Sequence, residues 1–465
     1  MDTNLSDIKQ EIATPDQVEY DIIIKWLSEQ NIRKISQYLW EPQRMLEHRL
    51  KSYKTFLEMP MPKWGPDLSK INFDEIVYFA KIKNLDKYKT DWDQVPDEVK
   101  RTYQKLGIPE AEAKYLAGAG GQFDAEMVYH RIQQRRADKG VIFEDMNEAV
   151  KKYPELVKKY FMKLIPPSDH KFAALHGAVW SWWTFIYIPK GVKVDQPLQA
   201  YFRMNIAWGG QFEHTLIILE DDTRGDYIEG CSAPIYRQIS IHAWWVEIYV
   251  GKNSHMRYSS VENWSVNTYN LNTKRALVEQ NSYMEWIGGN LGSWVTMLYP
   301  ASILKGDNSK ADHIGIALAT KNQYQDVGAK VIHIGKNTSS TIVSKSISKD
   351  WWISIYRGLV DIRPSAQGAV NSTECDALLL DDKSVSDTIP TIKVGNPDGV
   401  VAHEASAWKV DEDKLFYMMA RWLDEQQAMA MIVNGFISPV VKKLPLEYAG
   451  ELNRLIEMEM EWSVG

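Results

Sequence analysis

Two cysteines are the side chains best suited to chemistry in this chain of 465 residues. Cys231 lies in YIEGCSAPIY, at an expected turn or strand end, and Cys375 lies in NSTECDALLLDD, 144 residues further on (375 − 231). The chain contains no CxxC pair, so it cannot build a four-cysteine metal site alone, and two cysteines cannot form a disulfide framework at this length. The alternative for either cysteine is an inert, buried apolar residue.

Acidic neighbours set Cys375 apart. Glu374 and Asp376 flank it and would raise the pKa of its thiol unless a cation or metal offsets them. This environment is wrong for a simple nucleophile and acceptable for a metal ligand. His403 and Glu404 follow in HEAS, with His403 28 residues after Cys375 (403 − 375).

A thiolate, an imidazole and a carboxylate close together would suit iron or zinc. The set holds too few sulfurs for a closed iron–sulfur site, so another subunit or small molecules must complete it. In a regular strand, however, His403 and Glu404 face opposite ways, and both line one site only at a bulge or turn. An exposed polar pair is the alternative.

Turn residues recur at a nearly constant interval between residues 170 and 410. The turns begin at Asp222, Gly251, Glu279, Gly306, Gly335, Pro364 and Gly395, in steps of 27 to 31 residues. Short apolar runs such as WWVEIYV and KVIHIG precede nearly all of them. A constant step with strand-only content predicts a parallel β-helix with coils of about 28 residues, and a β-sandwich with evenly spaced turns is the alternative.

The β-helix places the candidate residues relative to one another. It stacks Cys375 and His403 on neighbouring coils. It separates Cys231 from Cys375 by about five coil spacings of 4.7–4.9 Å, too far for a disulfide. A sulfur atom passed between the two cysteines would therefore need carriers or a path.

Helical patterns flank the repeat region. Residues 1–165 are expected to be mostly helical, with helices at 41–59, 96–107 and 145–165, around a proline-interrupted segment at 59–69. After residue 410 we expect a helix from Asp411 and a second one with Asp424 and Gln427 as a capping box and Gly435 as its stop, then a last helix. The predicted organisation is an N-terminal helical domain (1–165), a β-helix core (166–410) and a C-terminal helical domain (411–465) that caps the solenoid and offers a docking face.

Composition excludes several classes of function. With 54 basic and 61 acidic residues the net charge is −7 and no basic cluster exists, which disfavours nucleic-acid binding. The chain opens without an apolar leader. The longest stretch without Asp, Glu, Lys or Arg runs from Phe172 to Pro189 and reads as buried core rather than a membrane span. We expect a cytoplasmic protein with no membrane partner. Without a GxxxxGK[ST] loop, ATP turnover must come from a partner.

Longer strings in the chain resemble the SufB/SufD family of the SUF iron–sulfur cluster assembly system, and within it SufB. The resemblance runs from about residue 40 to the C-terminus and is carried by MPMPKWGPDLS, YIEGCSAPIY, ECDALLLDDKSVSDTIP, HEAS and AMIVNGFI, among others. It implies a right-handed parallel β-helix between helical domains. It also implies a non-enzymatic scaffold that accepts persulfide sulfur and iron and passes clusters to apo-proteins. The implied partners are the ATPase SufC, SufD or a second SufB, and a cysteine desulfurase system. Reduced FAD is the implied electron source.

Site residues follow from the same resemblance. Cys231 matches the family's sulfur-accepting cysteine, and Cys375 matches the cysteine that holds the nascent cluster. His403 and Glu404 match a motif beside that cluster. Arg203 and Asn205 in AYFRMN match polar residues along the sulfur path, and residues 411–436 match the SufC-docking region.

Tryptophan is the main departure from the family pattern. The chain has 18 tryptophans, and seven stand where the family tends to glycine: Trp182, Trp183, Trp351, Trp352, Trp408, Trp422 and Trp462. Glycine reaches positive φ cheaply, whereas tryptophan there is strained. We hypothesise that some UGA codons, translated here as tryptophan, are glycine codons in the source cells. Genuine aromatic substitution, forming a surface patch, is the alternative.

Two other functions compete with the SufB interpretation. A β-helix polysaccharide lyase or hydrolase would use acidic clusters for catalysis or Ca²⁺, and Asp221–Asp222 and Asp381–Asp382 are the candidates. SufD, the paralogue in the same complex, shares the general fold. The ECDALLLD and HEAS strings favour SufB.

Overall fold

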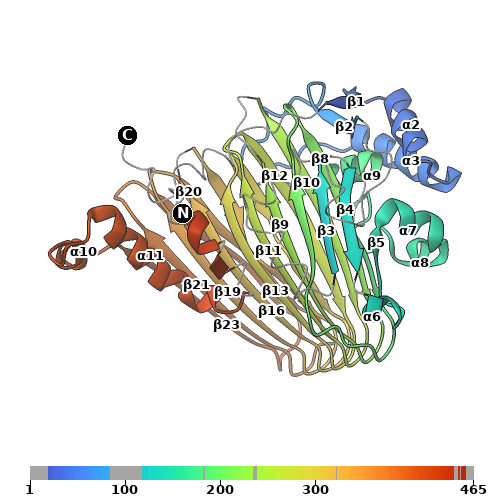
Figure 1. Ribbon diagram of the computed structural model, residues 1–465. Helices are drawn as coiled ribbons and strands as arrows, with labels where there is room; N and C mark the ends of the chain where they lie inside the picture. The colour runs from blue at the N-terminus through green and yellow to red at the C-terminus, as the bar shows by residue number, and fades with distance from the viewer. Residues whose placement is uncertain are drawn as a thin grey trace.

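A parallel β-helix of about eight turns, with about 29 residues per coil, forms the body of the computed structural model (Figure 1). Helices lie at both ends: those of residues 412–441 are near the last coils, and the N-terminal helices are near the first. This confirms the predicted fold class, and the coil of about 29 residues is close to the predicted length of about 28. The structure describes residues 19–83, 118–124, 126–132, 134–181, 184–233, 238–320, 322–444, 449–450 and 452–456.

Two long sheets form the walls of the β-helix. The first contains, in spatial order, β14 (Val295–Leu298), β17 (Tyr324–Val327), β20 (Ile353–Ile362), β18 (Lys330–His333), β15 (Ala301–Leu304), β12 (Thr268–Val278), β10 (Ser240–Val250), β8 (Gly210–Leu219), β6 (Thr184–Ile188) and β5 (Ile142–Asp145), with β22 (Val385–Val394) paired to β20. The second contains β23 (Val400–Lys409), β21 (Val370–Leu379), β19 (Ser339–Ser348), β16 (Lys310–Ala319), β13 (Tyr283–Gly292), β11 (His255–Trp264), β9 (Arg224–Ser232), β7 (Leu198–Arg203), β3 (Gly118–Phe123) and β4 (Glu126–Ile132). Successive coils pair in parallel, and within the described part of these two sheets the antiparallel pairs are the terminal ones, β5–β6 and β3–β4. Parallel pairing between successive coils rules out the sandwich.

The turns stack as their spacing predicted. Asp222, Asn253, Asn281, Asn308 and Asn337 all have φ between +54° and +62°, a region that Asn and Asp enter more readily than other side chains. The Asn253 amide donates to Asp222 at 3.0 Å, Asn281 to Asn253 at 3.1 Å and Asn308 to Asn281 at 3.0 Å. This side-chain ladder holds neighbouring coils in register.

The described part of residues 1–165 contains strands as well as helices, unlike the mostly helical region that we expected. Its helices are α2 (Glu29–Tyr38), α3 (Gln43–Glu58), α6 (Gln134–Ala137), α7 (Met146–Lys152) and α8 (Pro154–Tyr160). β1 (Tyr20–Lys25) pairs with β2 (Val77–Ile82) across some fifty intervening residues, a pairing that local periodicity cannot reveal. Residues 59–69 contain no helix, as predicted, and the helix predicted at 96–107 lies outside the described residues.

After the last coil come α10 (Glu412–Met419) and α11 (Glu425–Val441). The described residues 449–450 and 452–456 are helical as well, in agreement with the last helix that we expected. Asp424 and Gln427 form the predicted capping box. The predicted stop at Gly435 is wrong, because α11 continues to Val441. Val433 and Ile437 pack with Ile287 and Ile316 of the second sheet, and this burial outweighs the roughly 1 kcal/mol that glycine costs inside a helix.

The uncharged stretch from Phe172 begins in α9 (Lys171–Val179), whose residues from Phe172 onward are all buried. This agrees with its interpretation as core. No helix in the described part of the chain is long and apolar enough to cross a membrane.

Candidate functional site

Cys375 and His403 lie together at the last coil. The Cys375 Sγ is 3.6 Å from His403 Nε2. The register of β21 with β23 pairs Thr373 with His403 and Cys375 with Ala405, so the two side chains are diagonal neighbours on one face. The stacking that the spacing predicted therefore brings them into contact.

The surroundings keep this pair neutral. Burial, together with the charges of Asp376 and Glu374, raises the pKa of the Cys375 thiol to about 12. Burial lowers the pKa of His403. Tyr356 of β20 lies against both, because its hydroxyl hydrogen bonds to the Cys375 sulfur and its ring centroid is 6.3 Å from that of His403. A metal ion bound here would displace the thiol proton, and the neutral imidazole beside the sulfur could coordinate it.

Glu404 lies on the opposite face of β23. It pairs with Glu374 in an unbroken register and is exposed, so the strand alternation separates it from Cys375. On this outer face Asp376 accepts from Lys345 Nζ at 2.6 Å and from Ser406 Oγ at 2.5 Å. Among the described residues no three His, Cys, Asp or Glu side chains are grouped to hold a metal ion. The geometry supplies Cys375 and His403, and other ligands must come from elsewhere.

Cys231 is buried at the carboxyl end of β9, in agreement with its predicted place at a strand end. It pairs in register with Glu262 of β11 and Phe202 of β7. Burial raises the pKa of its thiol well above the ordinary value, and the nearby glutamates, Glu213 first, add to the shift. Both cysteines are free thiols.

A buried polar cluster that the sequence analysis missed lies beside Cys231. Glu262 accepts from Lys274 Nζ at 2.9 Å, from Asn270 at 2.8 Å and from Asn272 at 3.0 Å. The Lys274 ammonium also lies 3.9 Å from the ring centroid of Trp244. Burial opposes ionisation of Glu262, but Lys274, with smaller contributions from His242 and Asn270, outweighs it and holds the pKa of this carboxyl below its ordinary value.

Two further carboxyls of this cluster are held neutral. Burial raises the pKa of Glu229 to about 8, and its carboxyl accepts from the Tyr258 hydroxyl and from Thr215 Oγ1. Burial also raises the pKa of Glu213, which lies 3.0 Å from His242 Nε2. The signal in the sequence was glutamates at inward positions of apolar strands, which only the register of the coils identifies as inward.

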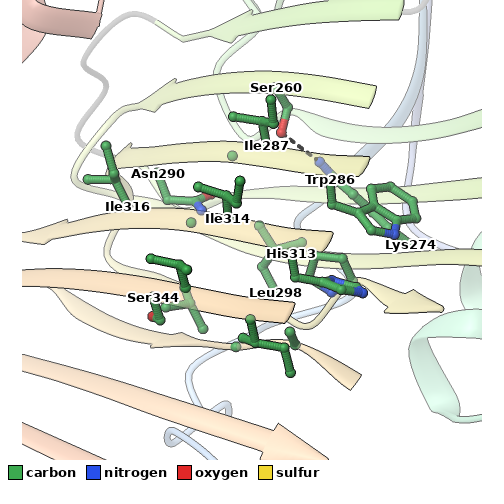
Figure 2. A pocket seen from close by; sticks show the side chains of 18 of the residues that line it. Ser260, Lys274, Trp286, Ile287, Asn290, Leu298, His313, Ile314, Ile316 and Ser344 are labelled. Atoms are coloured by element: carbon green, nitrogen blue, oxygen red, sulfur yellow. Dashed lines mark hydrogen bonds between the residues drawn. The ribbon is translucent and has the colours of Figure 1, made fainter. Parts of the chain in front are cut away.

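A row of small residues runs inside the β-helix from this cluster to Cys375. In register across six strands lie Glu229, Ser260, Gly288, Gly315, Ser344 and Cys375. A Cβ at Gly315 would meet nothing within 4 Å. A cavity of about 50 Å³ follows this row, and Figure 2 shows Lys274, Trp286, His313 and Ser344 around it, with the hydrogen bond from Lys274 to Ser260. Such a volume holds a few water-sized groups.

Arg203 and Asn205 lie near Cys231 but outside this row. Arg203 Nη1 donates to Ser232 Oγ at 3.2 Å, and Arg203 pairs with Ser232 in register while Phe202 pairs with Cys231. Arg203 therefore faces away from Cys231. The Asn205 backbone amide donates to the Asp124 carboxylate at 2.5 Å. The strand alternation therefore does not place Arg203 against the thiol, and the role of Asn205 on the sulfur path stays a prediction.

Asp221 and Asp381, from the two acidic pairs of the polysaccharide-enzyme hypothesis, stabilise turns by accepting backbone hydrogen bonds. Asp221 Oδ1 accepts from the Lys252 amide at 2.8 Å. Asp381 accepts from the Lys383 and Ser384 amides, each at 2.8 Å. These carboxylates satisfy backbone donors at separate turns and form no shared catalytic pair.

The coil that carries His403 is also the open end of the solenoid. β22 and β23 are largely exposed, and each has one edge that pairs with no strand among the residues that the structure describes. Several exposed apolar side chains lie on them: Val385, Ile389, Ile392, Val394, Val400 and Trp408. Unpaired edges with apolar side chains are typical of a surface that pairs with another chain.

Comparison with known proteins identifies the family. Residues 96–200 match the family model "SufBD protein N-terminal region", and residues 202–436 match "SUF system FeS cluster assembly, SufBD core domain". The iron-sulfur cluster assembly SufBD family proteins of Staphylococcus saprophyticus and Staphylococcus aureus are each 52% identical over 439 residues, which is 94% of this chain and 94% of theirs. The core match spans both cysteines, the row between them and the HEAS segment. The chain belongs to the SufBD family of iron–sulfur cluster assembly proteins.

Proposed function

We propose that this chain is a SufB-type scaffold that receives sulfur at Cys231 and assembles iron–sulfur clusters at Cys375. The observation that carries the proposal is the interior row of small residues, which joins the register position of Glu229, two residues before Cys231, to Cys375. The row favours the SufB interpretation because it links the surroundings of the cysteine that the resemblance identifies as sulfur acceptor to the cysteine that it identifies as cluster ligand.

Sulfur transfer to Cys231 begins with loss of its thiol proton. Glu262 is ionised and pairs with Cys231 in register, so it is the carboxylate placed to take that proton. The thiolate attacks the outer sulfur of a donor persulfide from a cysteine desulfurase system. The donor S–S bond breaks, the donor leaves as a thiolate, and a new S–S bond forms on Cys231 with no net oxidation or reduction.

Cluster assembly takes place at the other end of the row. The Cys375 thiolate and the His403 imidazole bind iron, and the remaining positions are filled by sulfide and by a partner chain. Each sulfane sulfur must gain two electrons to become sulfide. Reduced FAD, acting as an external reductant, is the electron source in this proposal, and the completed cluster passes to apo-proteins.

Two docking surfaces follow from exposure. The apolar edges of β22 and β23 seat SufD or a second copy of this chain, which brings further ligands next to Cys375 and His403. The α10–α11 region (411–436) seats the ATPase SufC, because Phe416 is 73% exposed and Tyr417, Met419 and Met431 are exposed beside it. The complex works in the cytoplasm.

The roles of the two cysteines can be distinguished by supplying sulfur in two ways, from the desulfurase and as free sulfide. Cys231→Ser should block assembly driven by the desulfurase but recover with iron plus free sulfide, which bypasses the sulfur acceptor. Cys375→Ser should fail in both regimes, because serine is a poor ligand for iron. Cluster content is measured anaerobically on the full complex by visible absorbance and iron analysis. Equal rescue of both variants by sulfide would remove Cys375 from the ligand set.

The SufC surface is tested without deleting α11, because α11 also covers the second sheet. Phe416→Ser with Tyr417→Ser should abolish co-purification with SufC. A matched double change on an exposed stretch of α3, Leu57→Ser with Lys54→Ser, should leave it intact. Retention of SufC at full stoichiometry by the first variant would overturn the assignment.

A further inference from the structure

A second cavity, of about 440 Å³, lies on the outer face of the first sheet, away from the two cysteines. The segment 59–64 and the start of α9 roof it, and β12, β14, β15 and β18 form its floor. Its volume is in the range of small-molecule sites. Its walls are largely aromatic and sulfur-containing: Met59, Met61, Trp64, Phe172, Met297 and Tyr299.

The basic side chains that line the cavity differ in their partners. Lys171 donates to the Phe56 and Met59 carbonyls at 2.7 Å each, and Lys63 is exposed. Arg275 is paired with Asp169 through two contacts of 3.0 and 3.3 Å, and Arg357, next to the cavity, is paired with Asp326 at 2.7 Å. Lys330, half-buried in the cavity wall, has no hydrogen bond or ion pair to any residue that the structure describes. Burial and then the Arg275 charge lower the pKa of its ammonium. An anion beside Lys330 would offset both effects.

The aromatic wall adjoins this ammonium. The Lys330 Nζ lies 4.8 Å from the ring centroid of Tyr299 and 5.9 Å from that of Trp64. The two rings are 5.7 Å apart and tilted by 50°. A flat ligand that stacks on one of these rings would therefore hold an attached anionic group near Lys330.

We propose that this cavity binds an anion of mononucleotide size that carries a planar aromatic ring. The aromatic wall takes the ring and Lys330 takes the anionic group, with the Arg275–Asp169 pair as a polar rim. The proposal does not depend on the scaffold function, since the cavity shares neither cysteine.

The test uses flavin mononucleotide, AMP, riboflavin and inorganic phosphate as probes, by isothermal titration calorimetry on the full chain. At least one of the two nucleotides should bind. If it is the flavin, riboflavin should bind at least tenfold more weakly, and phosphate alone should bind far more weakly still. Lys330→Gln should weaken the bound nucleotide at least tenfold and leave riboflavin unchanged, whereas Trp64→Leu should weaken both.

A matched control is Lys305→Gln, since Lys305 is a turn lysine paired with Glu279 and outside the cavity; it should change nothing. Failure of both nucleotides to bind overturns the proposal, as does nucleotide binding that both Lys330→Gln and Trp64→Leu leave unchanged.

A separate observation concerns the tryptophans. Trp26, Trp40, Trp208, Trp351 and Trp422 all have φ between +46° and +72°. Among the other non-glycine residues with positive φ in the described ranges, eight of ten are Asn or Asp, which is the expected preference. Five tryptophans in that region are not expected, because the bulky side chain gains nothing there and glycine is the residue that such positions favour.

Trp40 occupies a glycine position in a helix-ending motif. α2 ends with Leu39 as its C-cap, the Trp40 amide donates to the Gln37 carbonyl at 3.1 Å, and the Glu41 amide donates to the Ser36 carbonyl at 3.2 Å. This is the Schellman pattern, whose left-handed residue is usually glycine. The Trp40 side chain is 82% exposed, so packing does not offset the strain.

Trp351 and Trp422 also have the positive φ that favours glycine, but they lie in turns. Asp350 and Trp351 have φ of +59° and +72°, the paired left-handed conformation for which Asp-Gly is the preferred sequence. Trp422, in the turn after α10, is 98% exposed. By contrast, Trp286 is buried, donates to Ser302 Oγ at 3.1 Å and has no positive φ.

We infer that positions 40, 351 and 422 are glycine in the protein made by the source cells, through UGA codons that those cells decode as glycine. This extends the earlier hypothesis to Trp40, which the family pattern did not suggest. Trp352 and Trp408 have no positive φ, so the backbone does not support glycine at positions 352 and 408. Positions 182, 183 and 462 lie outside the described residues.

Peptide mass spectrometry of the protein isolated from its source cells decides the matter. Tryptic peptides spanning residues 35–44 and 350–357 should carry the glycine mass at positions 40 and 351, while Trp286 keeps the tryptophan mass. A tryptophan mass at both 40 and 351 overturns the inference. The sequence of the messenger RNA is the second measurement: UGG at those positions overturns it equally.

Discussion

Gly315 offers a direct test of the interior row, because it can be filled without straining the fold. It lies between Gly288 and Ser344 in register, and a Cβ there meets nothing within 4 Å. Gly315→Ala should therefore be neutral or stabilising by about 0.4–1 kcal/mol, since alanine restricts the unfolded chain. Gly315→Val adds two further methyl carbons to a cavity of about 50 Å³, in which a single water needs about 10–15 Å³.

Valine should consequently occupy most of the space along the proposed sulfur path. We expect Gly315→Val to slow desulfurase-driven cluster formation at least tenfold, Gly315→Ala to slow it less, and free sulfide with iron to restore both. The free energy of unfolding in urea shows whether the fold is intact. Gly450→Val is the matched control, because a Cβ at this exposed glycine also meets nothing within 4 Å; it should leave assembly unchanged. A folded Gly315→Val protein that assembles clusters from persulfide at the parental rate would refute the proposed path.

Three further predictions rest on the buried charges and the strained backbone. Lys274→Met should lower the free energy of unfolding by about 3–5 kcal/mol, because it leaves Glu262 buried without its partner, whereas Lys305→Met on the surface should change urea unfolding by less than about 0.5 kcal/mol. Glu229 has a folded pKa of about 8 against an ordinary value of 4.5, so its burial costs nothing below about pH 4.5 and progressively more as pH rises towards 8; Glu229→Gln should flatten that loss in urea titrations at pH 5 and pH 8, and an unchanged slope would contradict the assignment. In recombinant protein made with tryptophan, Trp40→Gly should stabilise by roughly 1–2 kcal/mol and raise the melting temperature, while Trp40→Ala, which keeps a Cβ at positive φ, should gain much less.

The regular spacing of turns made the core of the fold predictable. A constant step is a direct consequence of stacked coils, and the Asn and Asp residues at the turns are visible in the sequence because their left-handed backbone restricts residue choice. The same spacing placed His403 beside Cys375. The contact is diagonal rather than in register, because the final step from Cys375 to its partner Ala405 is 30 residues (405 − 375) rather than 28.

Other features depend on information that local sequence does not contain. β1 pairs with β2 over a long separation, so neither strand stabilises itself. Gly435 predicted the end of a helix, but the burial of Val433 and Ile437 on the sheet outweighs the low helix propensity of glycine. The inward glutamates were hidden for a similar reason: in a strand buried on both faces, alternation no longer distinguishes inside from outside, and only the ladder register assigns Glu229 and Glu262 to the interior.

The burial of both cysteines determines how the proposed scaffold is kept inactive. A pKa near 12 for Cys375 leaves almost no thiolate at neutral pH, and Cys231 is shifted in the same direction. Thiols without thiolate character resist oxidation and react slowly with persulfides. Activation must therefore come from outside the chain. At Cys375 the entering charge would be iron, and at Cys231 a donor would have to relieve the burial that is the largest cause of the raised pKa, with Glu262 as the proposed acceptor of the thiol proton. Because Cys375 and His403 provide only two ligands and lie by an unpaired edge, the arrival of a second chain would complete the metal site at the same time as it buries that edge.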